Sequence, residues 1–260
     1  MSKTRLNIPD NISKFVEAEY CDDFNINRYF ITQTQIDIIN DIERNGILSK
    51  KLKEYNINYV NTTLLYGPTG TGKTTFARFV ANRLRKDFVY LNFSSLMDGG
   101  FGNTERNLST VFRYMTAQDC IFMIDEIDCI ATSRTASTND TLKSITIALM
   151  QELDYCKSHN PKAIILAATN VVDNLDPALL SRFSIKKEIP LLNNDEKLGF
   201  VCKYLNDLDV PYNLDQVREY IARNHRVTQR VMEQDIIRAL ITWLNAEQQG
   251  FITLQAYHNY

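Results

Sequence analysis

The feature that most constrains the fold is a glycine-rich loop between a short apolar segment and an amphipathic one. Residues 61–66 are rich in Thr, Leu and Tyr, as in a buried strand, and residues 74–86 carry apolar side chains at helical spacing. The loop between them runs Gly-Pro-Thr-Gly-Thr-Gly-Lys-Thr from Gly67 to Thr74 and fits the pattern G-x-x-x-x-G-K-[ST]. In that context it predicts a phosphate cradle of backbone N–H groups at the positive end of a helix.

The residue types in this loop have distinct chemical uses. Lys73 would neutralise phosphate oxygens, and the Thr74 hydroxyl would bind Mg²⁺. We expect the whole loop to contact ATP, through Gly67, Pro68, Thr69, Gly70, Thr71, Gly72, Lys73, Thr74 and Thr75. The alternative is a glycine turn before a core helix, and the flanking strand and helix argue against it.

A pair of carboxylates follows another apolar segment, about fifty residues after the loop. Residues 120–124 form a continuous apolar run, typical of a strand buried on both faces, and Asp125 and Glu126 come next. Open parallel sheets bind ligands at the carboxyl ends of their strands. We therefore expect Asp125 to bind ATP and Mg²⁺, and Glu126 to polarise the attacking water. A solvated acidic turn is the alternative, and Asp128 could simply cap the next segment.

Strands and helices are expected to alternate up to Pro190, after which only helices are expected. Alternation of this kind predicts a parallel sheet with helices on both faces. The expected strands are 61–66, 88–93, 120–124, 163–168 and 184–189, and the expected helices before Pro190 are 35–46, 74–86, 104–116 and 141–155. Helices are then expected at 195–205, 214–224, 227–246 and 254–258. We predict an α/β fold, with an N-terminal arm (1–27), a nucleotide-binding α/β subdomain (28–191) and a small all-α subdomain (192–260).

Composition excludes several classes of protein. The chain has 260 residues, with 29 Lys and Arg against 31 Asp and Glu, so no global basic excess argues for nucleic acid. The five cysteines are scattered and predict reduced thiols rather than a disulfide framework. No apolar run approaches 18 residues, and the start lacks a signal-peptide pattern. We expect a cytoplasmic protein without a membrane partner.

Taken together, these motifs resemble those of the AAA+ ATPases, and the similarity extends from about residue 30 to 258. The resemblance implies that the loop and Asp125-Glu126 are the Walker A and Walker B motifs. Residues 167–170 match the sensor 1 strand, so Asn170 would hold the attacking water. Residues 175–183 match the second region of homology, so Arg182 would be the arginine finger that reaches the ATP of a neighbouring subunit. It also implies a P-loop large subdomain followed by a helical lid.

Two positions depart from the narrower AAA subgroup. That subgroup usually has R-P-G-R after D-P-A-L-L, whereas residues 181–183 hold a single arginine, as in clamp-loader-like branches. The subgroup also commonly lacks a sensor 2 arginine, yet Arg230 opens a lid helix where other branches have one. Arg230 could then contact ATP in its own subunit. The neighbouring arginines at 223, 226 and 238 leave this choice open.

The segment 95–108 is similar to the pore-loop region of protein-remodelling AAA rings. There, an aromatic side chain next to glycine grips a polypeptide, a role that Phe101 and Gly102 would have here. The alternative is that Phe101 packs beneath its own loop.

The first hypothesis for function is an ATP-hydrolysing homo-oligomer, a hexameric ring, that remodels or translocates a protein substrate delivered directly or by an adaptor. The second is a nucleic-acid-associated AAA+ ATPase, such as a clamp-loader-like, replication or transposition helper. A nucleotide-dependent scaffold with little turnover is a third class, which Glu126, Asn170 and Arg182 argue against. ATP and Mg²⁺ are the expected cofactors in the first two.

Overall fold

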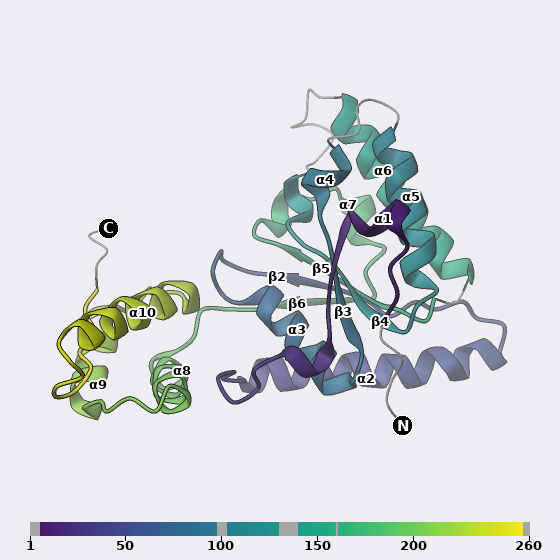
Figure 1. Ribbon diagram of the computed structural model, residues 1–260. Coiled ribbons are helices and arrows are strands. Elements are labelled where there is room, and N and C mark those ends of the chain that lie inside the picture. The colour runs from purple at the N-terminus through teal and green to yellow at the C-terminus, as the bar shows by residue number, and fades with distance from the viewer. Residues whose placement is uncertain (1–5, 98–102, 130–139, 160, 257–260) are drawn as a thin grey trace. The chain divides into compact units, whose positions relative to one another are not determined.

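The structure, a computed structural model, describes residues 6–97, 103–129, 140–159 and 161–256. The chain divides into two compact units (Figure 1). The large unit comprises residues 1–24, 36–67 and 73–188, and the small unit comprises residues 25–35, 68–72 and 189–260. The small unit thus includes two short segments from the first third of the sequence.

In the described residues of the large unit, six strands form one sheet in the order β1-β3-β4-β5-β2-β6. Their bounds are β1 Val16–Glu19, β2 Thr62–Tyr66, β3 Asp87–Leu91, β4 Cys120–Ile124, β5 Ile164–Thr169 and β6 Ile185–Glu188. All neighbouring pairs are parallel except β1 and β3. The predicted α/β class is confirmed, and the sheet is mostly parallel rather than wholly so.

The antiparallel edge strand β1 was not expected from the sequence. It lies in the segment that we predicted to be an arm, and Val16 is paired with Leu91 of β3. Only Val16 among its four residues is buried, so β1 has neither a continuous apolar run nor a long alternation that would predict a strand.

Helices flank the sheet on both sides (Figure 1). In the large unit they are α1 Asp10–Ser13, α2 Gln33–Glu54 (from its fourth residue on), α3 Lys73–Leu84, α4 Phe93–Met97, α5 Asn103–Thr116, α6 Asp140–His159 and α7 Pro177–Leu180, with 3-10 turns η1 Cys21–Asp23, η2 Ile127–Cys129 and η3 Val172–Asn174. One core cluster joins the central strands to α5 and α6. Every residue of β4 is buried, as its apolar run predicted.

Helix α2 is longer than expected, because it continues through Gly46. A Cβ at Gly46 would meet only Asn61 Nδ2, at 3.8 Å, so glycine is not required there. The helix ends instead before Asn56, which adopts a left-handed φ of 59°. The Ile57 N–H then donates to the Leu52 carbonyl at 2.9 Å, as in a Schellman ending.

The small unit is mainly helical and has its own core. Its helices are α8 Asn194–Asp207, α9 Leu214–Arg223 and α10 Gln229–Asn245. Each begins at a polar cap: Asn193 in a capping box with Glu196, Asn213, and Thr228. The predicted helix near residues 254–258 is wrong for residues 254–256, which are not helical. This segment follows an isolated parallel bridge between Ile252 and Tyr212.

Candidate nucleotide site

The sheet order brings most of the predicted site residues to one edge. Gly67 follows β2, Asp125 follows β4, and Asn170 follows β5. Strand β5 lies between β4 and β2 and is parallel to both, so the three carboxyl ends are adjacent. The ends of three different segments, separated by about a hundred residues of sequence, therefore meet where open parallel sheets bind ligands.

The glycine-rich loop has the backbone conformation that its composition predicted. Gly70 and Gly72 have φ values of 80° and 81°, which L side chains rarely adopt. A Cβ at Gly70 would also lie 2.7 Å from Thr228 Oγ1 within the small unit. Glycine is therefore required at position 70 for both conformation and space.

Lys73 is the first residue of α3, and its side chain joins two of the strand ends. Its Nζ donates to the Gly67 carbonyl and to Asn170 Oδ1, each at 2.8 Å. The residue is 7% exposed, and burial lowers the pKa of its ammonium group. The carboxylates of Asp125, Asp128 and Glu126 oppose this shift. A largely buried cation thus lies among carboxylates at the edge of the sheet.

Thr74 and Asp125 form a pair suited to a magnesium ion. The Thr74 hydroxyl donates to Asp125 Oδ2 in a short hydrogen bond. Mg²⁺ prefers oxygen ligands and is usually held by one or two protein groups together with substrate phosphates and water. Among the described residues, no group of three or more His, Cys, Asp or Glu could form a cage for a metal. The donor set fits an ion that arrives with a nucleotide.

Glu126 follows Asp125 and is exposed. Its φ is 51°, an uncommon conformation for a residue other than glycine. Its N–H donates to Asp125 Oδ1 at 2.9 Å, which ties the turn to the preceding carboxylate. Unusual backbone conformations of this kind cluster at functional sites.

Arg182 is not brought together with the other predicted residues. Its carbonyl accepts a hydrogen bond, at 2.9 Å, from the hydroxyl of Thr62, the first residue of β2, whereas Gly67 follows the last. The five residues of β2 therefore span roughly 15 Å between these positions. The Arg182 guanidinium instead donates from Nη2 to Asp154 Oδ2 on α6, at 3.0 Å, and from Nη1 to the Ala178 carbonyl.

In the small unit, the start of α10 contacts the loop segment 68–72. The N–H of Arg230 donates to the Gly70 carbonyl at 3.1 Å. Arg223 and Arg238, by contrast, form ion pairs with Glu219 and Asp235 on their own helices. Arg230 thus contacts the loop through its backbone N–H. Phe101 and Gly102 lie outside the described residues.

Two acidic residues were not assigned a place in the site by sequence reasoning. Asp128 Oδ1 accepts from the N–H of Asn170, and Asp154 binds Arg182. Asp128 lies close to the Walker B motif in sequence, but it resembles an ordinary turn residue. Asp154 lies in the middle of an amphipathic helix, and no sequence pattern distinguishes it from a solvated carboxylate.

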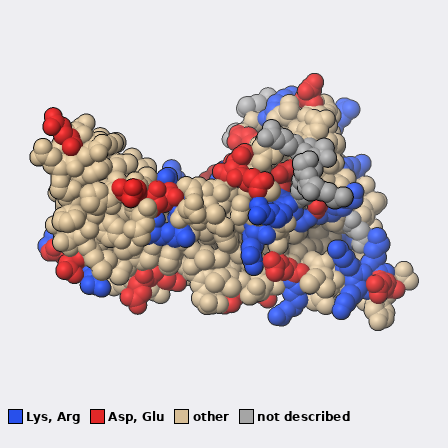
Figure 2. Space-filling model, turned by 60° about the horizontal axis from the view of Figure 1, so that its bottom comes forward, with Lys and Arg blue, Asp and Glu red and all other residues tan. Residues whose placement is uncertain are grey.

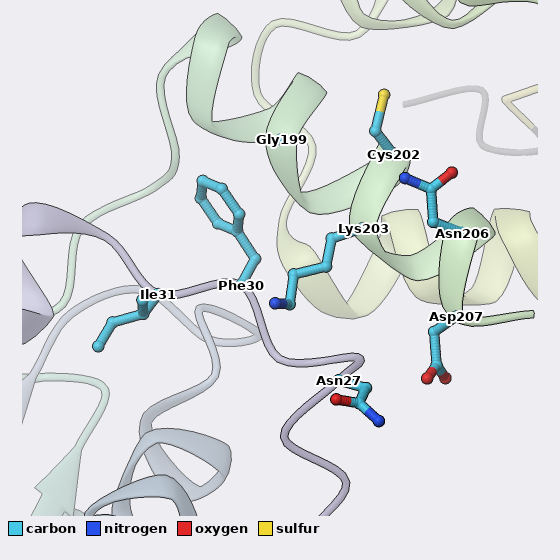
Figure 3. A pocket seen from close by; sticks show the side chains of 8 residues that line it. All are labelled: Asn27, Phe30, Ile31, Gly199, Cys202, Lys203, Asn206 and Asp207. Atoms are coloured by element: carbon cyan, nitrogen blue, oxygen red, sulfur yellow. The ribbon is translucent and has the colours of Figure 1, made fainter.

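A separate open cleft of about 800 Å³ lies in the small unit (Figure 3). It is lined by Asn27, Phe30 and Ile31 from one segment and by Gly199, Cys202, Lys203, Asn206 and Asp207 from α8. The Phe30 ring approaches α8 so closely that a Cβ at Gly199 would lie 2.4 Å from it (Figure 3). None of the predicted site residues lines this cleft.

Charges of both signs lie side by side on the face shown in Figure 2. Lys and Arg side chains are interspersed there with Asp and Glu, in agreement with the formal net charge of −2. This face does not have the basic stripe that typifies nucleic-acid binding. Among the described residues, no helix is both long and apolar enough to cross a membrane.

Comparison with known proteins shows similarity over the segment that contains the candidate site. Residues 63–191 match the model of the family described as "ATPase family associated with various cellular activities (AAA)". The chain belongs to the AAA+ ATPases. Members of this family are enzymes that hydrolyse ATP. The matched segment contains the glycine-rich loop, Asp125, Glu126, Asn170 and Arg182.

The relatives of this AAA+ chain are named for different cellular processes. A putative 26S proteasome regulatory subunit homologue from Methanocaldococcus jannaschii is 28% identical over 192 residues, which are 73% of this chain and 51% of the relative. The ribosome biogenesis ATPase Rix7 of Saccharomyces cerevisiae is 31% identical over 63% of this chain and 20% of its own. The 26S proteasome regulatory subunit S10B homologue B of Arabidopsis thaliana is 36% identical over 52% of this chain and 35% of its own. The chain thus spans about half or less of these relatives.

Proposed function

We propose that this AAA+ chain hydrolyses ATP at the edge of the sheet described above and uses the energy to remodel a protein substrate. The observation that carries the proposal is the meeting of Lys73, Asp125 and Asn170 at the carboxyl ends of adjacent strands. Phosphoryl transfer depends mostly on positioning and charge stabilisation, so a few well-placed groups are sufficient.

Each group in the site has a proposed role. Bound ATP would supply the phosphoryl group, and Mg²⁺ would supply a divalent positive charge that stabilises negative charge on the phosphates. Residues 67–75 hold the phosphates through backbone N–H groups, and Lys73 adds a cation. Thr74 and Asp125 hold Mg²⁺, while Glu126 accepts a proton from the attacking water and Asn170 orients that water.

The position of Arg182 supports a shared site between subunits. Arg182 is held near the start of β2, whereas the phosphate loop follows the end of that strand. An arginine in this position is better placed to reach the nucleotide of an adjacent copy than that of its own chain. We therefore propose a homo-oligomer, a hexameric ring, in which Arg182 completes the neighbouring site. Arg230 would contact ATP within its own chain.

A complementation assay tests the shared site. Glu126→Gln and Arg182→Ala should each abolish turnover when assayed separately. Mixing the two should restore part of it, because an Arg182→Ala subunit retains Glu126 and can receive Arg182 from a Glu126→Gln neighbour. A mixture as inactive as its components would refute the in-trans assignment. A mixture of Glu126→Gln with Lys73→Ala, in which each type retains Arg182 but has an impaired site of its own, is the matched control.

The names of the relatives favour a protein substrate over a nucleic acid. Two are assigned to the proteasome and one to ribosome biogenesis. We propose that Phe101 and Gly102 form a pore loop that grips the substrate. Phe101→Ala should then abolish work on a substrate while leaving basal ATP hydrolysis intact, and normal substrate processing by this variant would refute the proposal.

The alternative function is a nucleic-acid-associated ATPase. Two observations favour it: the single arginine in residues 181–183 and the position of Arg230 at the start of α10, next to the loop residue that its backbone contacts. Protein contacts to phosphates make nucleic-acid affinity fall steeply with salt concentration. If this alternative holds, DNA binding measured by fluorescence anisotropy should show that fall between about 50 and about 200 mM salt. No binding at the lower concentration would remove it.

A further inference from the structure

We propose that Asp128 is a positioning residue for ATP hydrolysis, acting through the sensor residue Asn170. Asp128 lies in the 3-10 turn η2, which directly follows the acidic end of β4. The turn is fixed by a hydrogen bond from the Cys129 N–H to the Glu126 carbonyl, at 3.0 Å, and by the buried side chain of Ile127. The half-buried carboxylate of Asp128 is therefore attached to a well-defined piece of backbone.

The carboxylate contacts the backbone at the residue where the sensor strand has ended. Asp128 Oδ1 accepts from the N–H of Asn170 at 3.3 Å. Asn170 is the first residue after β5, so its N–H lies beyond the last residue assigned to the strand. The hydrogen bond to the Asp128 carboxylate therefore holds the Asn170 backbone just beyond the end of β5.

The same asparagine continues the contact into the phosphate site. Its Oδ1 accepts from Lys73 Nζ at 2.8 Å, and Lys73 also donates to the Gly67 carbonyl at 2.8 Å. Asp128, Asn170 and Lys73 therefore form a series of hydrogen bonds that runs from η2 to the phosphate loop. Moving the Asn170 backbone would move the amide that is proposed to orient the attacking water.

Catalysis is sensitive to such displacements, because a shift of about 1 Å in a positioning group can cost about a hundredfold in rate. The contribution of Asp128 is its acceptor oxygen, which an asparagine side chain also provides. The negative charge of Asp128 makes a second contribution, because it opposes the lowering of the Lys73 pKa by burial. These two contributions can be separated by substitution. The inference rests on the proposed function through the role given to Asn170.

The experiment compares Asp128→Ala with Asp128→Asn in steady-state ATP hydrolysis, with ADP binding measured in parallel. Asp128→Ala should lower kcat about tenfold, because one charge-assisted hydrogen bond is removed. Asp128→Asn should stay within about threefold of the wild type, because the acceptor remains. ADP affinity should change little in either variant. A deficit in Asp128→Asn as large as in Asp128→Ala, or wild-type kcat in Asp128→Ala, would overturn the proposal.

A double-mutant cycle tests whether Asp128 acts through Asn170. Adding Asp128→Ala to Asn170→Ala should cause little further loss, since the residue to be positioned is already gone. Additive losses would overturn the inference. Wild-type turnover in Asn170→Ala would refute instead the role assigned to Asn170 in the proposed function. Asp173→Ala, at an exposed carboxylate in η3, is the matched control, and thermal unfolding checks that all variants are folded.

Discussion

Lys73 and Arg182 are two cations of the large unit that are both proposed to face phosphate, yet their surroundings differ. Lys73 is 7% exposed, and carboxylates from Asp125, Glu126 and Asp128 act on it. The Arg182 side chain is 26% exposed and pairs with a single carboxylate, Asp154, which is itself half exposed. The first cation lies at the carboxyl ends of the strands, and the second lies near the start of β2.

The difference follows from the topology of the sheet. In a parallel sheet, the loop after one strand lies next to the loops after the neighbouring strands. Lys73 is therefore near Asn170 through contacts within the large unit alone. Arg182 precedes β6, and the start of a strand lies at the opposite edge of the sheet. Lys73 thus lies at the candidate site of its own chain, whereas Arg182 lies away from that site and is bound to Asp154. The variants below test that contrast.

The largest effect is expected from Arg182→Ala. Arginine fingers in related nucleotide hydrolases are worth about 10³–10⁵ in rate, so kcat should fall by about 10³ or more. ADP affinity of the dilute chain should be unchanged, because Arg182 is proposed to act in the site of a neighbouring subunit and not in its own. Steady-state turnover and calorimetric ADP titration measure the two quantities. Arg218→Ala, at an exposed arginine on α9, is the control, and a large loss of ADP affinity in Arg182→Ala would contradict the contrast.

Lys73→Ala should produce the opposite combination. Removing a preorganised cation costs about 10²–10³ in kcat. The affinity for nucleotide should fall as well, because Lys73 is proposed to contact the phosphates in the ground state. Two assays distinguish the variants: turnover falls in both, and ADP binding falls only in Lys73→Ala. Lys157→Ala, at an exposed position on α6, is the control. Unchanged ADP affinity in Lys73→Ala would place this lysine outside the ground-state contacts.

The two cations also differ in how far the sequence could predict them. Lys73 belongs to a contiguous motif, in which glycines with positive φ and a following helix define the local structure. Its neighbours Asp125 and Asn170 could be placed nearby because each follows a buried strand. The pairing of Arg182 with Asp154 could not be predicted, since it joins two segments without any local pattern. The same is true of the bond between Asp128 and Asn170.

The fold shows the same distinction between local and long-range determinants. The buried strand β4 was predicted from its uninterrupted apolar run. Edge strand β1 was missed because its stability depends on pairing with β3, and its own four residues show no pattern. Gly199 lies within α8, where glycine lowers helix propensity. A glycine is needed at this position because the Phe30 ring, from a distant segment, leaves no room for a Cβ. Contacts between distant residues therefore account for β1 and Gly199, whereas a local pattern is sufficient for β4.

A smaller effect is expected from Asp154→Asn. In the proposed oligomer, Arg182 would have to leave Asp154 to reach a phosphate on another subunit, so the carboxylate would compete with that phosphate. Half-exposed ion pairs contribute about 0.2–1 kcal/mol, so removing the charge should raise turnover up to about fivefold at limiting protein concentration. The unfolding free energy should change by less than about 1 kcal/mol. Lower turnover in Asp154→Asn would mean that the carboxylate positions the guanidinium for use. Glu54→Gln, at the exposed end of α2, is the control.

The smallest effect concerns the electrostatic environment on the Lys73 side. Cys129 is exposed as a whole residue, but its thiol is partly buried. This burial, and to a smaller extent the negative charges of Asp128 and Glu126, raises the thiol pKa to about 11. Only the thiolate reacts with iodoacetamide, so the alkylation rate of the Cys129 peptide should still be rising about tenfold per pH unit between roughly pH 8 and 10. Mass spectrometry without Mg²⁺ or nucleotide measures this rate. Glu126→Gln should shift the profile slightly to lower pH, because one of the opposing charges is removed. A plateau below about pH 9, near the ordinary thiol pKa, would show that the carboxylates around Lys73 do not create the negative environment that distinguishes it from Arg182.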